Sequence, residues 1–346
     1  MWLQISGEES LTADDLKALA QAGFDHVRLP VDPMKLGWQA ATGAAGAFGR
    51  QPLLDEVVHR IIDAGLNLIL DFHPDGASLG FLRTAGGEPA WVEAWGAWAG
   101  RYAAIPSDRL VFELMNEPSR VYGTDRGAWT RAQARAVERI RKSAPANWIM
   151  TTGTYDPLNY VRSLEPPADR RIVATAHCYW PYELTHMGAS WDDAVTTGRR
   201  DVRNLRYPAN LTAPDAPHVA PGGDPERVGR LVREYLAAGW DIEKIRPHIE
   251  DTAKWSHERG IPVHFTEFGV LRLYADPDSR LRWLSDVRSL LESYGIGWSL
   301  WDLSCTFGII ELDGTGPSHW HKLCPAHAGP IRVEPAVRTA LGLRGA

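Results

Sequence analysis

The sequence predicts a single (β/α)₈ TIM barrel over residues 1–346, an α/β fold. Two observations support this prediction. Short apolar segments alternate with segments of helical periodicity, which is typical of a parallel sheet covered by helices. The length of 346 residues also fits, because such a barrel typically needs about 250 residues and tolerates insertions.

Eight short apolar segments are expected to be the strands of the barrel. In chain order they are Trp2–Ile5, His26–Leu29, Asn67–Phe72, Leu110–Met115, Trp148–Thr152, Ile172–Ala176, Pro262–Thr266 and Ile296–Leu300. Active sites of these barrels lie at the C-terminal ends of the strands. The residues expected there are Arg28, His73, Asn116, Glu117, His177, Glu267 and Trp301.

Helical periodicity fills the intervals between the strands. Thr12 is a good N-cap, Asp14 and Asp15 follow it in the first turn, and Gly23 is a stop signal. The segment Leu53–Ala64 repeats this design before Gly65. Further helices are expected at Glu88–Tyr102, Arg126–Lys142, Ile242–Arg259, Ser279–Tyr294 and Glu334–Leu343, with a short one near Pro157–Leu164.

Two segments interrupt this alternation. Met34–Arg50 is rich in Gly and Ala and is expected to be a loop over the barrel mouth. Tyr179–Trp240, after the sixth strand, is too long and too rich in proline for a plain connection. We expect residues 179–240 to form an extended loop that shapes a binding cleft; a small structural insertion is the alternative.

The composition limits the classes of partner. A net charge of −6 argues against a nucleic-acid partner, which favours a clustered basic patch. The densest basic stretch, Arg199–Arg206, is interpreted as a solvated face, with a phosphate or acidic-sugar site as the minor alternative. The 15 Trp residues exceed what core packing usually uses and suit binding of flat apolar faces such as pyranose rings.

Membrane and compartment signals are weak. No stretch approaches the roughly 20 apolar residues of a membrane span, so no membrane partner is expected. No signal peptide is visible, so the protein is expected to be cytoplasmic, or else secreted or periplasmic if its native N-terminus has been removed. The spacing of Cys178, Cys305 and Cys324 matches no zinc or redox motif. Whether Cys305 and Cys324 pair stays open, and so does the oligomeric state.

Glu117 and Glu267 are the candidates for catalysis. Cleavage of a glycosidic bond needs two carboxyl groups that flank the bond. The two glutamates end the fourth and seventh predicted strands, on opposite sides of the mouth of a barrel. A retaining mechanism would require the two carboxyl groups to be about 5–5.5 Å apart.

The motifs around these glutamates resemble those of a known family. Met115–Pro118 (MNEP) looks like the acid/base motif of the clan A glycoside hydrolases, and Thr266–Gly269 (TEFG) resembles their nucleophile motif. The fuller match, over about residues 24–302, is to glycoside hydrolase family 5, the cellulase and mannanase family. Eight residues match its −1 subsite in order: Arg28, His73, Asn116, Glu117, His177, Tyr179, Glu267 and Trp301.

The resemblance implies a role for each residue. Glu117 would be the acid/base and Glu267 the nucleophile. Asn116 would donate to a sugar 2-hydroxyl, and Tyr179 would hydrogen-bond the nucleophile. For three other residues an alternative stays open. Arg28 either holds Glu267 ionised or makes a structural salt bridge, and His73 either contributes to the subsite or is purely structural. Trp301 either forms a stacking floor for the sugar or packs against the end of the barrel. The chain departs from the family pattern at its first strand and in residues 179–240, where Trp180 and Trp191 are expected to line sugar subsites.

These expectations identify a retaining glycoside hydrolase that acts on an oligo- or polysaccharide and needs no cofactor and no metal. The commonest activity of similar proteins is that of an endo-β-1,4-glucanase. A β-mannanase, a β-1,3-glucanase or an exo-β-glucosidase stays open, and an inactive glycan-binding barrel is the remote alternative. A metal-dependent hydrolase is disfavoured because the sequence has no HExxH motif and its histidines are scattered.

Overall fold

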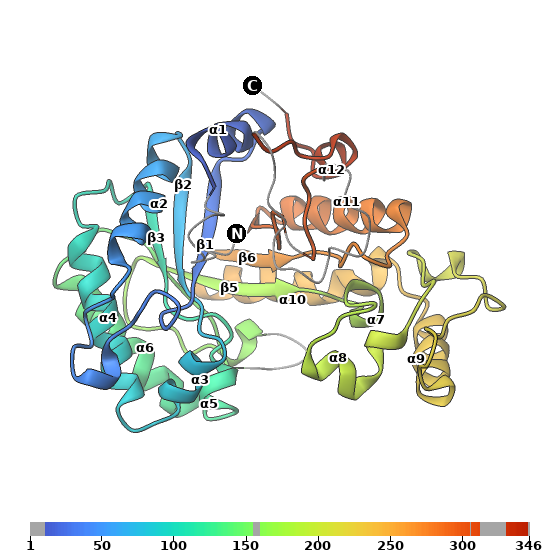
Figure 1. Cartoon of the computed structure of the whole chain (residues 1–346), viewed down its shortest axis with the longest axis horizontal. Helices are drawn as coiled ribbons and strands as arrows, with labels where there is room; N and C mark the ends of the chain where they lie inside the picture. Colours follow the sequence, from blue (N-terminus) through green and yellow to red (C-terminus); the bar gives the residue numbers. More distant parts are fainter. Residues whose placement is uncertain (1–10, 155–159, 305, 312–329, 345–346) are drawn as a thin grey trace. The chain divides into compact units, whose positions relative to one another are not determined.

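The computed structural model describes residues 11–154, 160–304, 306–311 and 330–344. Within these residues, seven strands form one sheet in the order of the sequence (Figure 1). The strands are β1 (His26–Val31), β2 (Asn67–Phe72), β3 (Leu110–Glu113), β4 (Ile149–Thr151), β5 (Ile172–Cys178), β6 (Val263–Phe268) and β7 (Gly297–Trp298). Each strand from β1 to β4 pairs in parallel with the next. The predicted parallel α/β fold is therefore confirmed, whereas the predicted strand Trp2–Ile5 lies outside the described residues.

The contacts divide the chain into two compact units. The first unit comprises residues 1–176, 254–264 and 346, and the second comprises residues 177–253 and 265–345. The helices of the first unit are α1 (Ala13–Ala22), η1 (Ala40–Thr42), α2 (Gln51–Asp63), α3 (Ala77–Leu82), α4 (Gly87–Arg101), α5 (Ser119–Tyr122), α6 (Arg126–Arg141) and η2 (Tyr160–Ser163). Those of the second unit are α7 (Tyr182–Thr185), α8 (Asp192–Thr197), η3 (Arg199–Asp201), η4 (Ala209–Leu211), α9 (Pro225–Ala238), α11 (Pro277–Ser293) and α12 (Pro335–Ala340), while α10 (Ile242–Arg259) contributes to both.

The helix signals of the sequence act as expected. At the start of α1, the hydroxyl of Thr12 accepts from the backbone N–H of Asp15, whose carboxylate accepts from the backbone N–H of Thr12. This reciprocal capping box satisfies two backbone donors that the first turn would otherwise leave unpaired. Gly23 ends the helix with a left-handed φ of 103°, which glycine adopts without steric cost.

Tryptophans of α4 form much of the core of the first unit. Trp91, Trp95 and Trp98 recur at helical spacing and are fully buried, and their rings pack around Phe72 of β2. The indole N–H groups of Trp91 and Trp95 both donate to the carbonyl oxygen of Leu114, at 3.1 and 2.9 Å. The tryptophans therefore fix the end of β3 just before Asn116 and Glu117, and part of the surplus of Trp is explained by packing.

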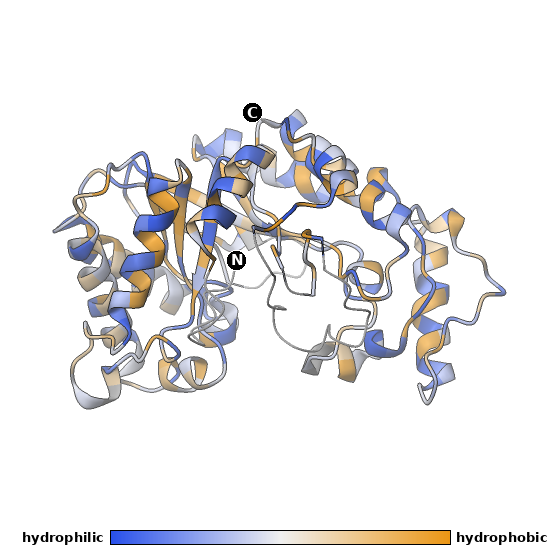
Figure 2. Cartoon of the chain, turned by 45° about the horizontal axis from the view of Figure 1, so that its top comes forward, coloured by the Kyte–Doolittle hydropathy of each residue, from blue (hydrophilic) through white to orange (hydrophobic). Residues whose placement is uncertain are grey.

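Residues 179–240 are not the extended loop that the sequence predicted, because they contain α7, α8, η3, η4 and α9. Helix α9 is the clearest example. Asp224 caps it by accepting from the N–H groups of Glu226 and Arg227, and Gly239 ends it in the left-handed region. Val228, Val232 and Tyr235 form its buried face. Figure 2 shows that α9 carries both hydrophobic and hydrophilic residues. Neighbouring proline and glycine residues masked this helical periodicity.

Cys178 is buried near the end of β5, and burial raises the pKa of its thiol to about 12. Cys305 and Cys324, whose pairing was left open, lie outside the described residues. So does the start of the short helix expected near Pro157–Leu164, of which the structure describes η2. No helix in the described part of the chain has the length and apolar character needed to cross a bilayer.

Candidate active site

Arg28 is the centre of a buried ionic network in the first unit. Its guanidinium donates to both carboxylate oxygens of Glu113, at 2.6 and 3.0 Å, and forms an ion pair of 2.9 Å with Asp71. The strand register explains this grouping, because Asp71 lies opposite Glu113 on β3 and opposite Pro30 on β1, two residues from Arg28. Arg28 thus makes the salt bridges within the sheet that were one of its two expected roles. Burying such charges is tolerable only because they are paired.

The same network orients Asn116. The side-chain oxygen of Asn116 accepts from Arg28 at 3.0 Å, and its amide nitrogen lies 3.2 Å from Nε2 of His73. Nδ1 of His73 is 2.7 Å from the carboxylate of Asp71. Since a carboxylate only accepts, Nδ1 carries the proton, and Nε2 accepts from the amide. The amide of Asn116 therefore has one defined orientation and a second N–H that can donate to a sugar hydroxyl.

Glu117 follows with an unusual backbone. Its φ is +43°, in the left-handed region that residues with a side chain seldom adopt. Pro118 follows it, and the carbonyl oxygen of Glu117 accepts from the N–H of Arg120 in the turn that starts α5. Backbone strain of this kind costs on the order of 1–3 kcal/mol and is often found at functional sites. Glu117 is half-buried at the start of this turn.

Glu267 lies on β6 in the second unit and is buried. The hydroxyl of Tyr179 donates to its Oε2 at 2.9 Å, and Nδ1 of His177 lies 3.5 Å from the same oxygen. His177 belongs to β5 and Tyr179 follows this strand directly, so two adjacent strands position the three side chains. Donated hydrogen bonds stabilise the negative charge of a carboxylate in a buried place. The sequence prediction that Tyr179 hydrogen-bonds Glu267 is confirmed.

Trp301 is half-buried beyond β7, and its backbone N–H donates to the carbonyl oxygen of Phe268 at 2.9 Å. Gly269, the last residue of the TEFG motif, makes this approach possible. A Cβ atom at position 269 would collide with the carbonyl oxygen of Trp301. The glycine therefore allows the chain after β7 to lie against the chain after β6, beside Glu267.

An aromatic cluster supports Tyr179. The ring of Tyr179 contacts His186 at 4.9 Å and Phe307 at 5.8 Å, measured between centroids. Trp191 packs on both of these residues and is 38% exposed. Burial and the nearby charge of Arg199 lower the pKa of His186 to about 3, so its imidazole is neutral.

Trp180 lies in a different stack. Its ring is parallel to that of His248, at 4.9 Å, and to that of Trp240, at 6.3 Å. The carbonyl oxygen of Trp180 accepts from the indole of Trp283 on α11. These contacts connect residues 179–240 to α10 and α11. The expectation that Trp180 lines a sugar subsite stays a prediction.

The structure thus places the predicted site residues in two sets. Arg28, His73 and Asn116 form one network beside Glu117 in the first unit, and His177, Tyr179 and Glu267 form the other in the second unit. Sequence reasoning missed Asp71 and Glu113. The available signal was an acidic residue inside an otherwise apolar strand, which must be paired to be buried.

The family model described as cellulase (glycosyl hydrolase family 5) matches residues 2–306. Endoglucanase 3 of Fibrobacter succinogenes is 26% identical over 315 residues, which cover 87% of this chain and 47% of that protein. The chain therefore spans about half the length of this relative.

Two further comparisons agree. Endoglucanase C of Acetivibrio thermocellus is 26% identical over 300 residues, covering 84% of this chain and 83% of that protein. Among solved structures, Cel5A of Thermotoga maritima in complex with mannotriose has a TM-score of 0.73 at 19% identity. That match covers 99% of this chain and 96% of the other, and it shows that the fold is shared.

Proposed function

The chain belongs to glycosyl hydrolase family 5, and we propose that it is a retaining endo-β-1,4-glucanase in which Glu267 is the nucleophile and Glu117 the acid/base. The observation that carries the assignment of Glu267 is its buried carboxylate inside the TEFG motif, which accepts from the hydroxyl of Tyr179 and lies 3.5 Å from Nδ1 of His177. The names of two relatives, both endoglucanases, support the choice of substrate and of internal cleavage.

The proposed reaction has two displacements. First, Glu267 attacks the anomeric carbon while the bond from this carbon to the glycosidic oxygen breaks, and Glu117 gives its proton to the leaving oxygen. Second, Glu117 takes a proton from water, and this water displaces Glu267 from the anomeric carbon. Each step inverts the anomeric carbon, so the product keeps the β configuration of the substrate.

The neighbouring residues have supporting roles in this proposal. Asn116, held by Arg28 and His73, donates its second N–H to the 2-hydroxyl of the sugar, a contact that strengthens in the transition state. Tyr179 holds Glu267 in one position before and during attack. Trp301 gives the sugar a stacking surface, and Trp191 extends the aromatic surface to a further sugar.

We further propose that the sheet is an eight-stranded closed barrel, with Trp2–Ile5 as the additional strand. The sequential order of β1 to β7 and the parallel pairing of β1 to β5 support this topology. Residues 179–240 are, in this proposal, an insertion after the sixth strand of the barrel, built from short helices and α9.

Hydrolysis of a panel of soluble substrates tests the substrate and the mode of action. We expect hydroxyethyl cellulose to be cleaved with a rapid fall of viscosity, because each internal cut shortens the polymer strongly. Release of glucose or cellobiose without a fall of viscosity would instead indicate exo action. Activity on β-1,3-glucan alone would contradict the proposed linkage.

A β-mannanase is the second candidate. It is favoured by the fold that this chain shares with Cel5A of Thermotoga maritima, whose structure was solved in complex with mannotriose. The same panel separates the two, because a mannanase would cleave a soluble β-1,4-mannan in preference to hydroxyethyl cellulose. Comparable kcat/KM values on both polymers would indicate a dual specificity.

A further inference from the structure

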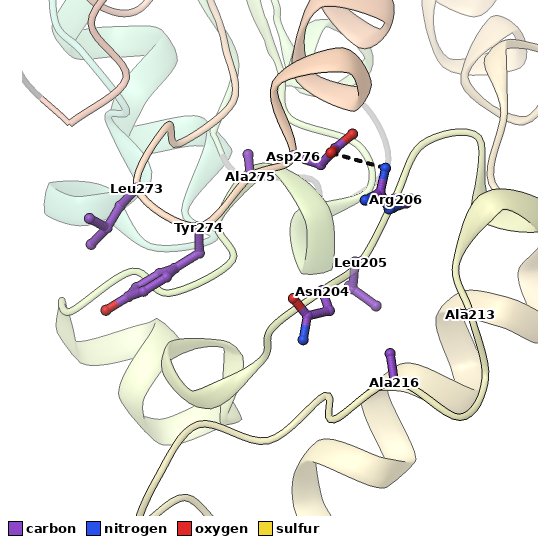
Figure 3. A pocket seen from close by; sticks show the side chains of 9 residues that line it. All are labelled: Asn204, Leu205, Arg206, Ala213, Ala216, Leu273, Tyr274, Ala275 and Asp276. Atoms are coloured by element: carbon purple, nitrogen blue, oxygen red, sulfur yellow. Dashed lines mark ion pairs between the residues drawn. The ribbon is translucent and has the colours of Figure 1, made fainter. Parts of the chain in front are cut away.

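A pocket of about 400 Å³ lies in the second unit, apart from the residues assigned to catalysis (Figure 3). The lining comes from three segments: the one between η3 and η4, the one between η4 and α9, and the one between β6 and α11. The polar side chains of its lining are Asn204, Arg206, Tyr274 and Asp276, and the others are small or aliphatic.

The polar side chains are held in place. Arg206 and Asp276 form an ion pair of 3.0 Å across the pocket (Figure 3). Asp276 is also fixed as the N-cap of α11, where it accepts from the N–H and the hydroxyl of Ser279. The carbonyl oxygen of Arg206 accepts from the hydroxyl of Tyr235 at 2.6 Å. Groups that are already ordered lose little entropy when a ligand binds.

The ring of Tyr274, which also lines the pocket, is held in place as well. The guanidinium of Arg203 lies 3.6 Å from the centroid of the Tyr274 ring. Gly188, with a φ of 84°, leaves room for this ring, because a Cβ atom at position 188 would collide with it. Arg203 donates to the carbonyl oxygens of Arg200 and Val202, which hold its charge beside the ring. Tyr274 is 38% exposed.

The charges of the lining point to a neutral ligand. The two charged side chains of the lining, Arg206 and Asp276, pair with each other, so the lining itself carries no net charge. A guanidinium, a carboxylate and the amide of Asn204 together offer donors and acceptors, which suit neighbouring hydroxyl groups. Leu273 and the alanines offer apolar contact for the C–H groups of a sugar ring.

The lining of the pocket is in contact with the residues that surround Glu267. Leu273, which lines the pocket, packs against the cluster formed by Tyr179, Leu271 and Phe307. Tyr179 in turn hydrogen-bonds Glu267. We propose that the pocket is an additional binding site for a glucosyl residue of a β-glucan chain, and that it favours polymers over short substrates. This inference rests on the proposed function.

The test compares a polymer with a short substrate. The ratio of kcat/KM on hydroxyethyl cellulose to kcat/KM on an aryl β-cellobioside is measured for the whole chain. We expect Arg206→Ala to lower this ratio about tenfold, since hydrogen bonds to a charged group contribute on that order. Arg200→Ala is the matched control: its ion pair with Asp201 is equally exposed, at 49% for each arginine, and does not line the pocket. It is expected to keep the wild-type ratio.

A second variant tests whether the effect of Arg206→Ala comes only from the loss of its ion pair with Asp276. Ala216→Trp fills the pocket while it keeps Arg206 and Asp276, and we expect it to lower the ratio to a similar extent. If both variants keep the wild-type ratio while the wild type cleaves the polymer, the pocket is not a sugar site and the proposed function stands. If the wild type cleaves no β-glucan, both the proposed function and the sugar assignment are wrong.

Discussion

Glu267 and the carboxylates of the first unit are buried in different ways. Asp71 and Glu113 share the guanidinium of Arg28, which compensates for their burial. Glu267 is held by Tyr179 and His177 instead. A carboxylate in a hydrogen bond with a neutral hydroxyl keeps more of its charge available for attack than one in a bidentate ion pair. This difference fits a structural role for the first two residues and a chemical role for Glu267.

Glu267→Ala removes the proposed nucleophile, and we expect it to abolish hydrolysis of all β-glycosides, including those with good leaving groups. The measurement is initial rates on a soluble polymer and on a dinitrophenyl β-cellobioside. A rate near that of the wild type on either substrate would show that another residue attacks the sugar.

Glu117→Ala should behave differently. General acid/base catalysis contributes about 10²–10⁴-fold, so turnover of the polymer should fall by that factor. A dinitrophenyl cellobioside needs no protonation and should still form the glycosyl-enzyme, from which added azide releases a β-glycosyl azide. Failure of azide to raise the rate would contradict the acid/base assignment.

Tyr179→Phe tests the hydrogen bond to Glu267 while it keeps the ring contacts with His186 and Phe307. We expect kcat to fall roughly tenfold to a hundredfold, because hydrogen bonds to charged groups contribute about 1.5–3 kcal/mol, and KM to change little. Tyr294→Phe, at the end of α11, is the control. An unchanged kcat in Tyr179→Phe would mean that the hydroxyl is dispensable.

At the scale of elements, the positions of the strands were easier to predict than the contacts between side chains on neighbouring strands. The bounds of β2 agree with the predicted Asn67–Phe72, because an apolar run between a glycine stop and a polar residue defines a buried strand. The partners of Arg28 could not be predicted in the same way. They depend on the register that places Asp71 opposite Glu113, and register is a property of strand pairs.

Helix α9 shows what could have been found in residues 179–240. Asp224-Pro225 is an N-cap followed by proline in the first turn, and Gly239 is a stop signal. The buried residues Val228, Val232 and Tyr235 have helical spacing. The proline-rich flanks led to the prediction of a loop, although the local signals for a helix were present.

Asp224→Ala should therefore destabilise α9. Loss of an N-cap typically costs about 1 kcal/mol, which urea unfolding followed by circular dichroism would measure. Asp215→Ala, an exposed aspartate between η4 and α9, should change the free energy of unfolding much less. Equal effects of the two substitutions would argue against a capping role for Asp224.

At the scale of the whole molecule, a buried histidine makes stability depend on pH. Burial, together with the charges of His26 and Arg28, lowers the pKa of His264 to about 3. Between about pH 3 and the ordinary histidine value of 6.5, the unfolded chain binds a proton that the folded chain does not. The contribution of His264 to the stability of the folded state is therefore complete above pH 6.5, and the folded state loses stability as the pH falls toward 3.

His264→Gln should flatten this dependence. Each such histidine contributes a slope of at most about 1.4 kcal/mol per pH unit in this window. We expect the free energy of unfolding of the variant, measured by urea titration from pH 7 to pH 4.5, to fall less steeply than that of the wild type. His257→Gln, at an exposed position on the last turn of α10, is the control. Parallel curves for wild type and His264→Gln would contradict the assignment.

The central claim is a retaining mechanism with Glu267 as the nucleophile, and the anomer of the first product tests it most directly. A β-glucan oligosaccharide is hydrolysed inside an NMR tube, and the anomeric proton signals are followed before mutarotation equilibrates them. The account predicts that the β-anomer accumulates first, because two displacements restore the configuration of the substrate. Initial accumulation of the α-anomer would show inversion, and Glu267 could then not be the nucleophile.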